Sequence, residues 1–282
     1  MDLSETIYTD RSERAKLRFT GEQRAWFLHQ IMTQAFEDIA PGEARDAVLL
    51  THHGRMVGYM ETLATEDAIL AHFEPELRSS FAEAIGRYVF ATRVEITDVT
   101  EDMGLMLVAG PRTEEMVALA PAGSPIHRTR SLGVDASYVW VSRAGVKELV
   151  AVLDKAGCRA APEEELEAIR IANGIPRWGR DMTEKTLPQE ARLEGGAVHL
   201  DKGCYVGQEA VAKIHFRGKV NRLLRRIEIE GAVEAGAEVM LDGDRVGVVT
   251  SAAGERALAM LKHRVEPGTT VQIGDVKATV VE

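Results

Sequence analysis

The final quarter of the sequence constrains the fold most, because it consists of short apolar or alternating segments separated by turn residues. Asp242-Gly243-Asp244 is typical of a hairpin turn, and Pro267-Gly268 and Gly274-Asp275 are further turn pairs. About five or six short strands within some sixty residues predict a small antiparallel β-barrel. The expected strands are Leu223–Ile229, Gly236–Leu241, Arg245–Ser251, Ala257–Leu261 and Thr270–Val280.

The residues before this region mix helical and strand patterns, which predicts an α+β fold. Apolar side chains recur at helical spacing in several segments, and short apolar or alternating segments lie between them. The expected helices are Glu22–Met32, Pro75–Tyr88, Ala144–Lys155 and Pro162–Ala172, and the expected strands are Ala15–Thr20, Ala47–Leu50, Met56–Ala64, Val94–Val99, Leu105–Ala109 and Ser137–Val141.

Residues 103–162 follow a different order, with a strand, a helix, further strands and a helix within about fifty residues. This order predicts a ferredoxin-like α+β subdomain, a sheet under two helices, inserted into the first domain. We therefore expect a discontinuous α+β domain of residues 1–102 and 163–219, the inserted subdomain of residues 103–162, and a barrel of residues 220–282.

Composition narrows the class of protein. The chain has 282 residues and a net charge of −10, which argues against broad binding to nucleic-acid phosphates. Since no run of about 18 apolar residues occurs, we expect no transmembrane helix. The first residues are charged and lack an apolar core, so we expect no signal peptide.

Cysteines and histidines indicate neither a disulfide nor a metal centre. Cys158 and Cys204 differ in context, and a structural disulfide between them is not expected in a chain that we predict to be cytoplasmic. His52 and His53 are neighbours in a turn, where adjacent side chains usually point apart. No third potential metal ligand stands at a suitable spacing from them in the sequence, so no metal site is predicted.

Residues 201–219, DKGCYVGQEAVAKIHFRGK, form the segment with the most chemical potential. Cys204 lies between Gly203 and Gly207, follows Lys202, and precedes a helix expected to begin near Gln208. Backbone N–H groups at that helix start would lower the pKa of a nearby thiol. Two interpretations stay open: a reactive thiol that faces the middle of the molecule, or a buried structural cysteine in a glycine-rich turn.

A second segment, Ile175–Arg192, also has two interpretations. It contains two prolines, few apolar residues and many charges. Such a segment is either a solvated connector or a loop that lines a cleft, because long loops in compact proteins are often functional.

The sequence KGCYVGQE, from Lys202 to Glu209, resembles the K-G-C-Y-x-G-Q-E motif of the YgfZ-type proteins. These proteins belong to the folate-binding superfamily of the aminomethyltransferase, the T-protein of the glycine cleavage system. Other segments resemble the same family in the same order, so the resemblance covers nearly the whole chain. They are Phe19-Thr20-Gly21, Pro41-Gly42, Gly54-Arg55, Arg170–Pro176, Leu187–Glu190 and His215–Lys219.

The resemblance implies a cloverleaf of two α+β parts around a central hole, followed by a C-terminal β-barrel. It also implies that tetrahydrofolate or a derivative binds in the hole. Members of this branch are associated with the assembly or repair of iron–sulfur enzymes and with effects on tRNA modification. The motif cysteine, Cys204 here, is regarded as their functional residue, and we take Lys202 as its catalytic neighbour.

The chemistry of a folate suggests candidate ligand-binding residues. A carboxylate can bind the donor edge of a pterin, and an aromatic ring can stack on its face. Arginines near the start of the barrel can hold the carboxylates of the glutamate tail, although a solvated strand edge is the alternative for them. The candidates are Glu190 and Asp181 for the edge, Trp178 and Tyr205 for the face, Arg217 and Arg222 for the tail, and Gln208 and Glu209 from the motif.

Two positions differ from the aminomethyltransferase pattern. Ala172 and Asn173 stand where that branch has a glutamate that contacts the pterin. His72-Phe73-Glu74-Pro75 stands near the position of its catalytic aspartate.

We therefore favour a folate-binding accessory protein with iron–sulfur client or assembly partners. The alternatives are a folate-dependent aminomethyl or one-carbon transferase with Glu190 as base, and a tRNA-modification factor, which the acidity of the chain disfavours.

Overall fold

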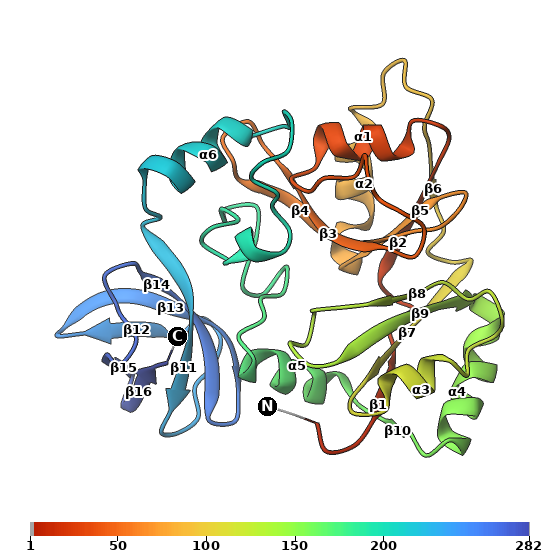
Figure 1. Cartoon of the computed structure of the whole chain (residues 1–282). Helices are drawn as coiled ribbons and strands as arrows, with labels where there is room; N and C mark the ends of the chain where they lie inside the picture. Colours follow the sequence, from red (N-terminus) through yellow and green to blue (C-terminus); the bar gives the residue numbers. More distant parts are fainter. Residues whose placement is uncertain (1–2, 282) are drawn as a thin grey trace.

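A computed structural model describes residues 3–281, apart from the side chain of Arg217. The chain forms two α+β parts and a C-terminal barrel, arranged around the middle of the molecule (Figure 1). A long loop after helix α5 (Glu163–Ala172) runs between the three parts and carries only a short 3₁₀ turn, Leu193–Gly195. This arrangement confirms the predicted α+β cloverleaf with a C-terminal β-barrel.

The first part is an antiparallel sheet with strand order β3-β4-β5-β2-β6. Its strands are β2 (Ala15–Thr20), β3 (Ala44–Leu50), β4 (Met56–Ala64), β5 (Ile69–Phe73) and β6 (Glu95–Asp98). Helices α1 (Arg24–Ile31) and α2 (Arg78–Gly86) cover one face, α2 being preceded by a 3₁₀ turn at Pro75–Leu77. Phe27, Leu28, Phe81 and Ile85 of these helices are buried in its core.

Strand β4 alternates between the two faces of this sheet, as the period of two requires. A Cβ at Gly58 would lie 2.6 Å from the ring of Phe81 on α2, and Met60 is buried in the same core. Tyr59 and Glu61 therefore point to the opposite face, towards the second part of the molecule.

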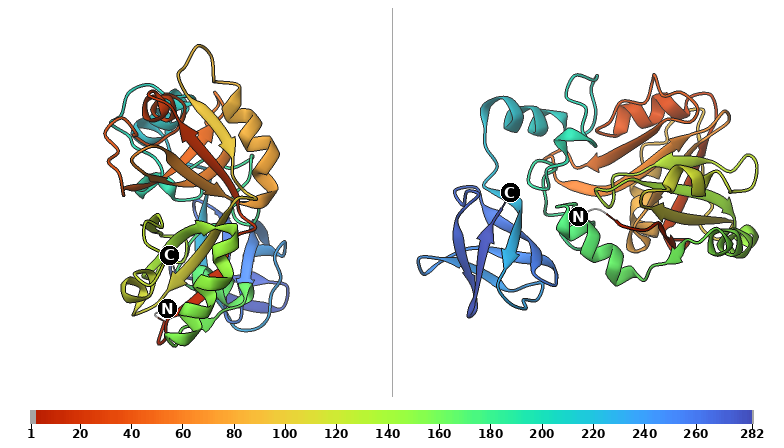
Figure 2. Two further views of the ribbon diagram at one scale, coloured as in Figure 1. Left: turned by 90° about the vertical axis from the view of Figure 1, so that its right-hand side faces the viewer. Right: turned by 60° about the horizontal axis from the view of Figure 1, so that its bottom comes forward.

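The second part is a sheet with strand order β10-β1-β7-β9-β8. Its strands are β1 (Ile7–Asp10), β7 (Met103–Ala109), β8 (Ile126–Arg128), β9 (Ala136–Ser142) and β10 (Arg159–Ala160). Helix α3 (Thr113–Val117) and helix α4 (Val146–Lys155), with a 3₁₀ turn at Arg143–Gly145, cover one face. Its other face packs against the first sheet, as the buried cluster of Leu63, Leu70, Leu105, Tyr138 and Trp140 shows (Figure 2).

The first strand crosses from one part to the other. β1 lies beside β7, with Tyr8 opposite Val108, so the residues before β2 contribute to the second sheet. The domain boundaries given above stay a prediction.

The barrel closes in the order β11-β14-β13-β12-β15-β16. Its strands are β11 (Arg222–Ile229), β12 (Glu238–Leu241), β13 (Asp244–Ala253), β14 (Arg256–Lys262), β15 (Thr270–Ile273) and β16 (Val276–Val280). Ile227, Val239 and Leu261 are among the apolar side chains that fill it. Asp242 and Gly243 have φ of 52° and 85°, as a tight hairpin with two left-handed residues requires.

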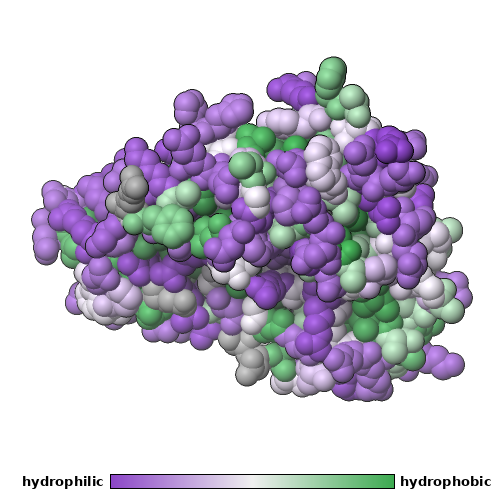
Figure 3. Space-filling model, turned by 45° about the horizontal axis from the view of Figure 1, so that its top comes forward, coloured by the Kyte–Doolittle hydropathy of each residue, from purple (hydrophilic) through white to green (hydrophobic). Residues whose placement is uncertain are grey.

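Helix α6 (Gln208–Arg217) leads from the central loop into the barrel. Among the described residues, none of the helices is both long and apolar enough to span a bilayer. Figure 3 shows a face of the molecule on which hydrophilic side chains predominate and hydrophobic groups form separate patches.

Candidate ligand-binding site

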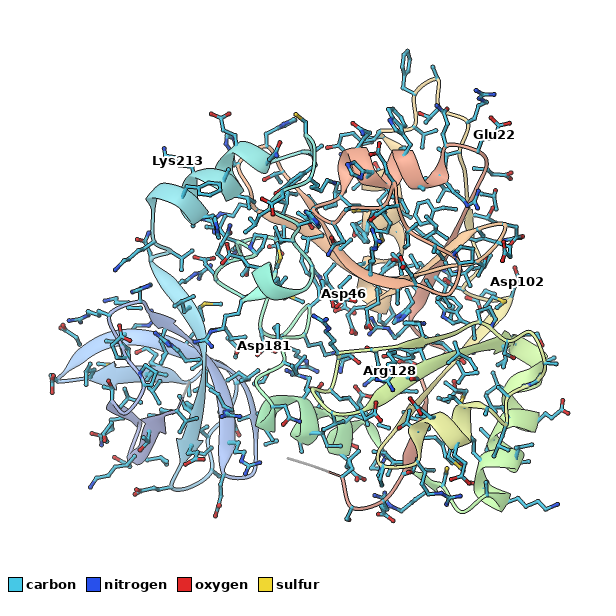
Figure 4. The ribbon with its side chains drawn as sticks, in the orientation of Figure 1. Glu22, Asp46, Asp102, Arg128, Asp181 and Lys213 are labelled. Carbon is cyan, nitrogen blue, oxygen red and sulfur yellow. The ribbon has the colours of Figure 1, made fainter. Side chains whose placement is uncertain are left out.

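A cavity of about 210 Å³ lies where the two sheets meet the central loop. Its walls come from β3, β4, β9 and α5, from the loops around β2 and β5 and the β8–β9 loop, and from the central loop at residues 175–178, 182 and 192–197. Figure 4 places Asp46, one of the lining residues, in the middle of the molecule between the two sheets. The cavity therefore corresponds to the central hole expected from the sequence.

The walls combine apolar surface with an excess of arginines. Leu132, Ile175, Trp178 and Leu193 supply apolar surface. Six arginines line the cavity, against four acidic residues, in a protein whose net charge is −10. The arginines are Arg11, Arg14, Arg130, Arg170, Arg177 and Arg192, and the acidic residues are Asp46, Glu61, Glu74 and Glu167. Four of these arginines are paired with carboxylates: Arg11 with Glu163, Arg14 and Arg177 with Glu74, and Arg170 with Asp181. A cavity with such a lining suits a small ligand that has both an apolar and a polar part.

Three polar side chains of the first sheet face this cavity together. Asp46 on β3 is directly opposite Glu61 on β4, and the Tyr59 hydroxyl lies close enough to Asp46 to affect its pKa. Thr129 donates from its hydroxyl to Glu61. Burial raises the pKa of Glu61 to about 7, with help from the nearby Asp46, and burial also raises the pKa of Asp46. The two carboxyl groups are therefore poised to hold a proton near neutral pH.

Glu74, also on the wall, has the opposite character. It forms ion pairs with Arg14 and with Arg177, whose Nη2 lies 2.8 Å from Glu74 Oε2. Burial alone would raise its pKa, but the two arginines outweigh burial and lower the pKa to about 2. Glu74 is therefore a fixed anion at neutral pH, which is unsuited to removing protons.

A buried ion-pair network connects the cavity wall to the barrel. Arg170 on α5 donates from Nη1 to Asp181 at 2.7 Å and to the carbonyl of Ile175 at 3.0 Å. Asp181 also accepts from Ser251 of β13 at 2.7 Å. These bonds explain why an arginine begins the turn Arg170–Pro176: its side chain closes the turn and fixes the barrel against it. They also commit Asp181, a candidate for the pterin edge that is not itself part of the cavity lining, to Arg170 and Ser251.

Glu61, His72 and His127 bring three potential ligand atoms within 4.8 Å of one another. The Arg14 Nε–H donates to His72 Nδ1 at 2.9 Å, so the neutral ring carries its own proton on Nε2. Burial, followed by the charge of Arg14, lowers the pKa of His72 well below its usual range and that of His127 to about 3. A ring that offers no lone pair on its inner side, next to a guanidinium, does not suit a cation. The cluster is better explained as packing between the two sheets.

Cys204 lies on the surface and not in the cavity wall. It is an exposed free thiol, whereas Cys158 is buried, and burial raises the pKa of the Cys158 thiol. The expectation that Cys204 faces the middle of the molecule is therefore wrong, because other segments supply the cavity lining. The exposed thiol also excludes the alternative of a buried structural cysteine.

Lys202, two residues earlier, is buried and anchors the Cys204 loop. Its Nζ donates to the carbonyl groups of His29, Met32 at 2.6 Å and Gln34 at 3.0 Å, around the end of α1. Its Nζ also lies 4.9 Å from the centre of the Tyr205 ring. Burial lowers the pKa of Lys202 to about 7. These contacts indicate that the lysine of the motif has a structural role, which is to hold the Cys204 loop against the end of α1.

The remaining candidates are spread over two places. Trp178 lines the cavity, with 6% of its surface exposed. Glu190 accepts from Arg222 Nε at 2.9 Å near the barrel, and neither residue belongs to the cavity lining. Tyr205 is buried, Gln208 is half-buried and Glu209 is exposed, all at or near the start of α6, while the side chain of Arg217 lies outside the described part of the chain. Their roles in ligand binding stay predictions.

Sequence reasoning did not single out Asp46, Tyr59 and Glu61. The available signal was an ionisable residue at an alternating position within an otherwise apolar strand, since Glu61 lies between Met60 and Thr62 in β4. That pattern alone does not distinguish a cavity wall from a solvated face.

The fold and cavity define an aminomethyltransferase-like protein. The solved glycine cleavage system aminomethyltransferase T from Bartonella henselae superposes with a TM-score of 0.88 over 99% of this chain and 85% of that chain, at 17% identity. Residues 4–146 match the GCVT N-terminal domain, and residues 222–282 match the CAF17 C-terminal beta-barrel domain. The chain belongs to the GCVT family, in its YgfZ/CAF17 type.

Curated relatives agree with this assignment. A chloroplastic protein of Arabidopsis thaliana, named as a candidate transferase, is 27% identical over 98% of this chain and 70% of its own length. An aminomethyltransferase of Rubrobacter xylanophilus is 26% identical over 86% of this chain and 70% of its own length. This chain is therefore a homologue of aminomethyltransferases with a transferase-like fold.

Proposed function

We propose that the protein binds a reduced folate, tetrahydrofolate or a derivative, in the central cavity. The observation that carries this proposal is the lining itself, which combines apolar side chains such as Trp178 with hydrogen-bond acceptors and arginines. A pterin needs a flat apolar slot with acceptors at its edge, and a glutamate tail needs cations. When bound, a folate supplies a carrier for one-carbon groups. Trp178 would cover the ring, and Arg130, at the exposed rim, would attract the tail.

A titration with 5-formyltetrahydrofolate, followed by tryptophan fluorescence and calorimetry, tests this proposal. We expect saturable binding and at least a tenfold loss of affinity in Trp178→Ala, because the variant removes the apolar wall. Trp26→Ala is the matched control, since Trp26 is 46% exposed on α1 and lies outside the cavity lining. Lack of saturable binding by the intact protein would overturn the proposal.

We further propose that the folate-binding protein is an accessory factor for the assembly or repair of iron–sulfur proteins, with Cys204 as its reactive thiol. Support comes from the exposure of Cys204 within the KGCYVGQE motif, on a loop that Lys202 fixes to α1. An exposed thiol outside the ligand cavity is accessible to a protein partner while the cavity is filled.

Two measurements test the thiol role. In the native protein, we expect iodoacetamide to label Cys204 and to label Cys158 only after unfolding, because Cys158 is 6% exposed. In cells lacking the native gene, we expect Cys204→Ser to fail to restore iron–sulfur enzyme activity although its folate titration is normal. Full restoration by this variant would reject the role of the thiol.

A second candidate function is one-carbon or aminomethyl transfer from the folate. Two observations favour it: the relatives named aminomethyltransferase, and a carboxyl group in the cavity, Glu61, whose pKa is about 7. Glu190, the base suggested by the sequence, is paired with Arg222 outside the cavity lining. Turnover of 5,10-methylenetetrahydrofolate with amine substrates, lost in Glu61→Gln, would support this candidate over the accessory role. The third alternative, a tRNA-modification factor, rests on the resemblance alone.

A further inference from the structure

The carboxyl pair Asp46–Glu61 is unusual for its place in the sheet. The two residues are directly opposite in the antiparallel register of β3 and β4, which brings their Cβ atoms to within about 5 Å. Like charges at such positions repel each other, and burial strengthens the repulsion. Glu61 is only 2% exposed. A purely structural role would be better served by apolar side chains, so the pair requires another explanation.

The surroundings of the pair do not neutralise both charges. Arg14 Nη2 lies 3.9 Å from Glu61 Oε1, but the same guanidinium is already hydrogen-bonded to Glu74 and His72. The Tyr59 hydroxyl lies near Asp46, and the Thr129 hydroxyl donates to Glu61. The charged and titratable groups facing the pair from neighbouring elements are Arg14, Tyr59, His72, Glu74, His127, Arg130 and Tyr138.

We propose that Asp46 and Glu61, with Tyr59, form a proton-sharing group that binds the donor edge of the ligand ring and couples ligand binding to release of a proton. The inference rests on the proposed function. It goes further because it names the residues that hydrogen-bond to the ligand ring and the proton that these residues release to solvent. Its basis is geometric: two opposed carboxyl groups and a phenol on one face of the sheet, all in the cavity wall.

The direction of the coupling follows from hydrogen-bond chemistry. Without ligand, the pair retains a proton near neutral pH because two adjacent anions are unfavourable. The 2-amino and N3–H groups of a 2-amino-4-oxopteridine are donors, and donors are best accepted by ionised carboxylates. With one of these donors accepted by each carboxyl group, ligand binding favours ionisation of both groups, and the shared proton leaves for solvent.

Calorimetry tests the coupling directly. The probe is 5-formyltetrahydrofolate, titrated into the full chain at pH 6.5 in two buffers with different enthalpies of ionisation. We expect the wild-type protein to release up to one proton per bound ligand. In Glu61→Gln, whose amide oxygen can still accept from Thr129, release should fall close to zero and affinity should drop by about tenfold or more. Glu66→Gln is the control, because Glu66 is exposed in the turn after β4 and lies outside the cavity lining.

A second measurement needs no ligand, and it separates this inference from the proposed function. Infrared difference spectra of the ligand-free protein between pH 5 and pH 8 should show a protonated carboxyl band that is lost in Glu61→Gln and retained in Glu66→Gln. If the band is present and no folate binds, the proton-sharing group stands and the folate proposal fails. Lack of the band, or equal proton release by wild type and Glu61→Gln, overturns the inference.

Discussion

Asp181 accepts a hydrogen bond from Ser251 at 2.7 Å, across the boundary between the central loop and the barrel. Asp181 is 3% exposed and also pairs with Arg170, so one carboxylate joins helix α5, the loop and strand β13. The barrel is therefore fixed to the cavity wall by a charge and not only by apolar contact.

Replacing Asp181 with Ala should destabilise the protein by about 3–5 kcal/mol, because Arg170 would remain buried with part of its charge uncompensated. Urea unfolding followed by circular dichroism measures the change. The control is Glu83→Ala, which removes an exposed ion pair with Arg87, the residue directly after α2, and should cost less than about 1 kcal/mol. Equal effects of the two variants would show that the Asp181 network does not fix the barrel.

The lowered pKa of Glu74 predicts that the stability of the protein depends on pH. Its folded-state pKa of about 2 lies below the ordinary value of 4.5, because Arg14 and Arg177 outweigh the effect of burial. The ionised form is therefore favoured by folding. The contribution of Glu74 to stability is fully present above about pH 4.5 and is lost as the pH falls towards 2.

Glu74→Gln should accordingly lower the free energy of unfolding by about 3 kcal/mol at pH 7. The difference from wild type should shrink as unfolding is measured at pH 5, 4 and 3.5. Glu76→Gln, two residues away and exposed, should show little difference at any of these pH values. A difference for Glu74→Gln that stays constant down to pH 3.5 would contradict the assignment of the lowered pKa to this carboxylate.

Lys202 gives a third prediction, which concerns the cysteine loop. Lys202→Met keeps much of the apolar stem but leaves three carbonyl groups around the end of α1 without their donor, so we expect a loss of about 1–3 kcal/mol. Lys213→Met on the exposed side of α6 should be nearly neutral. If Lys202→Met keeps full stability in thermal unfolding but abolishes a Cys204-dependent activity, the lysine acts in chemistry and not as an anchor.

Elements whose stabilising contacts are local in the sequence were predicted, whereas elements held by contacts between distant segments were not. The barrel strands and most helices carry strong local patterns, and their predicted positions agree with the structure. Strands β1 (Ile7–Asp10), β5 (Ile69–Phe73) and β10 (Arg159–Ala160) were not predicted. Strand β1 is four residues long and is held by β7 and β10, which are distant in the sequence. A strand that is stabilised by such distant pairing has no strong pattern in its own residues.

The site was harder to predict than the fold for the same reason. Trp178 was proposed because an aromatic ring can stack on the face of a pterin, and the long irregular loop that contains it does line the cavity. Asp46 and Glu61 belong to regular strands, and only the packing of two sheets with the loop turns their face of β3 and β4 into a cavity wall. Asp181 and Glu190 were plausible pterin ligands by type, but each accepts a hydrogen bond from a barrel residue, Ser251 or Arg222, that lies about 30 to 70 positions away in sequence.

The two glycines of the KGCYVGQE motif have different tasks, and this gives the last prediction. Gly207 has φ of 82° at the start of α6, and a Cβ there would lie 2.5 Å from the carbonyl oxygen of Thr51 in the β3–β4 turn. At Gly203 a Cβ would lie 3.7 Å from His29 Nε2, an ordinary contact. Gly207→Ala combines a left-handed backbone with a clash against main chain, so we expect a loss of at least about 1–3 kcal/mol. Gly203→Ala should stay within about 0.5 kcal/mol of wild type, since it meets no clash. Thermal unfolding of the two variants tests whether the motif requires glycine at position 207. There the backbone holds the cysteine loop against the first sheet.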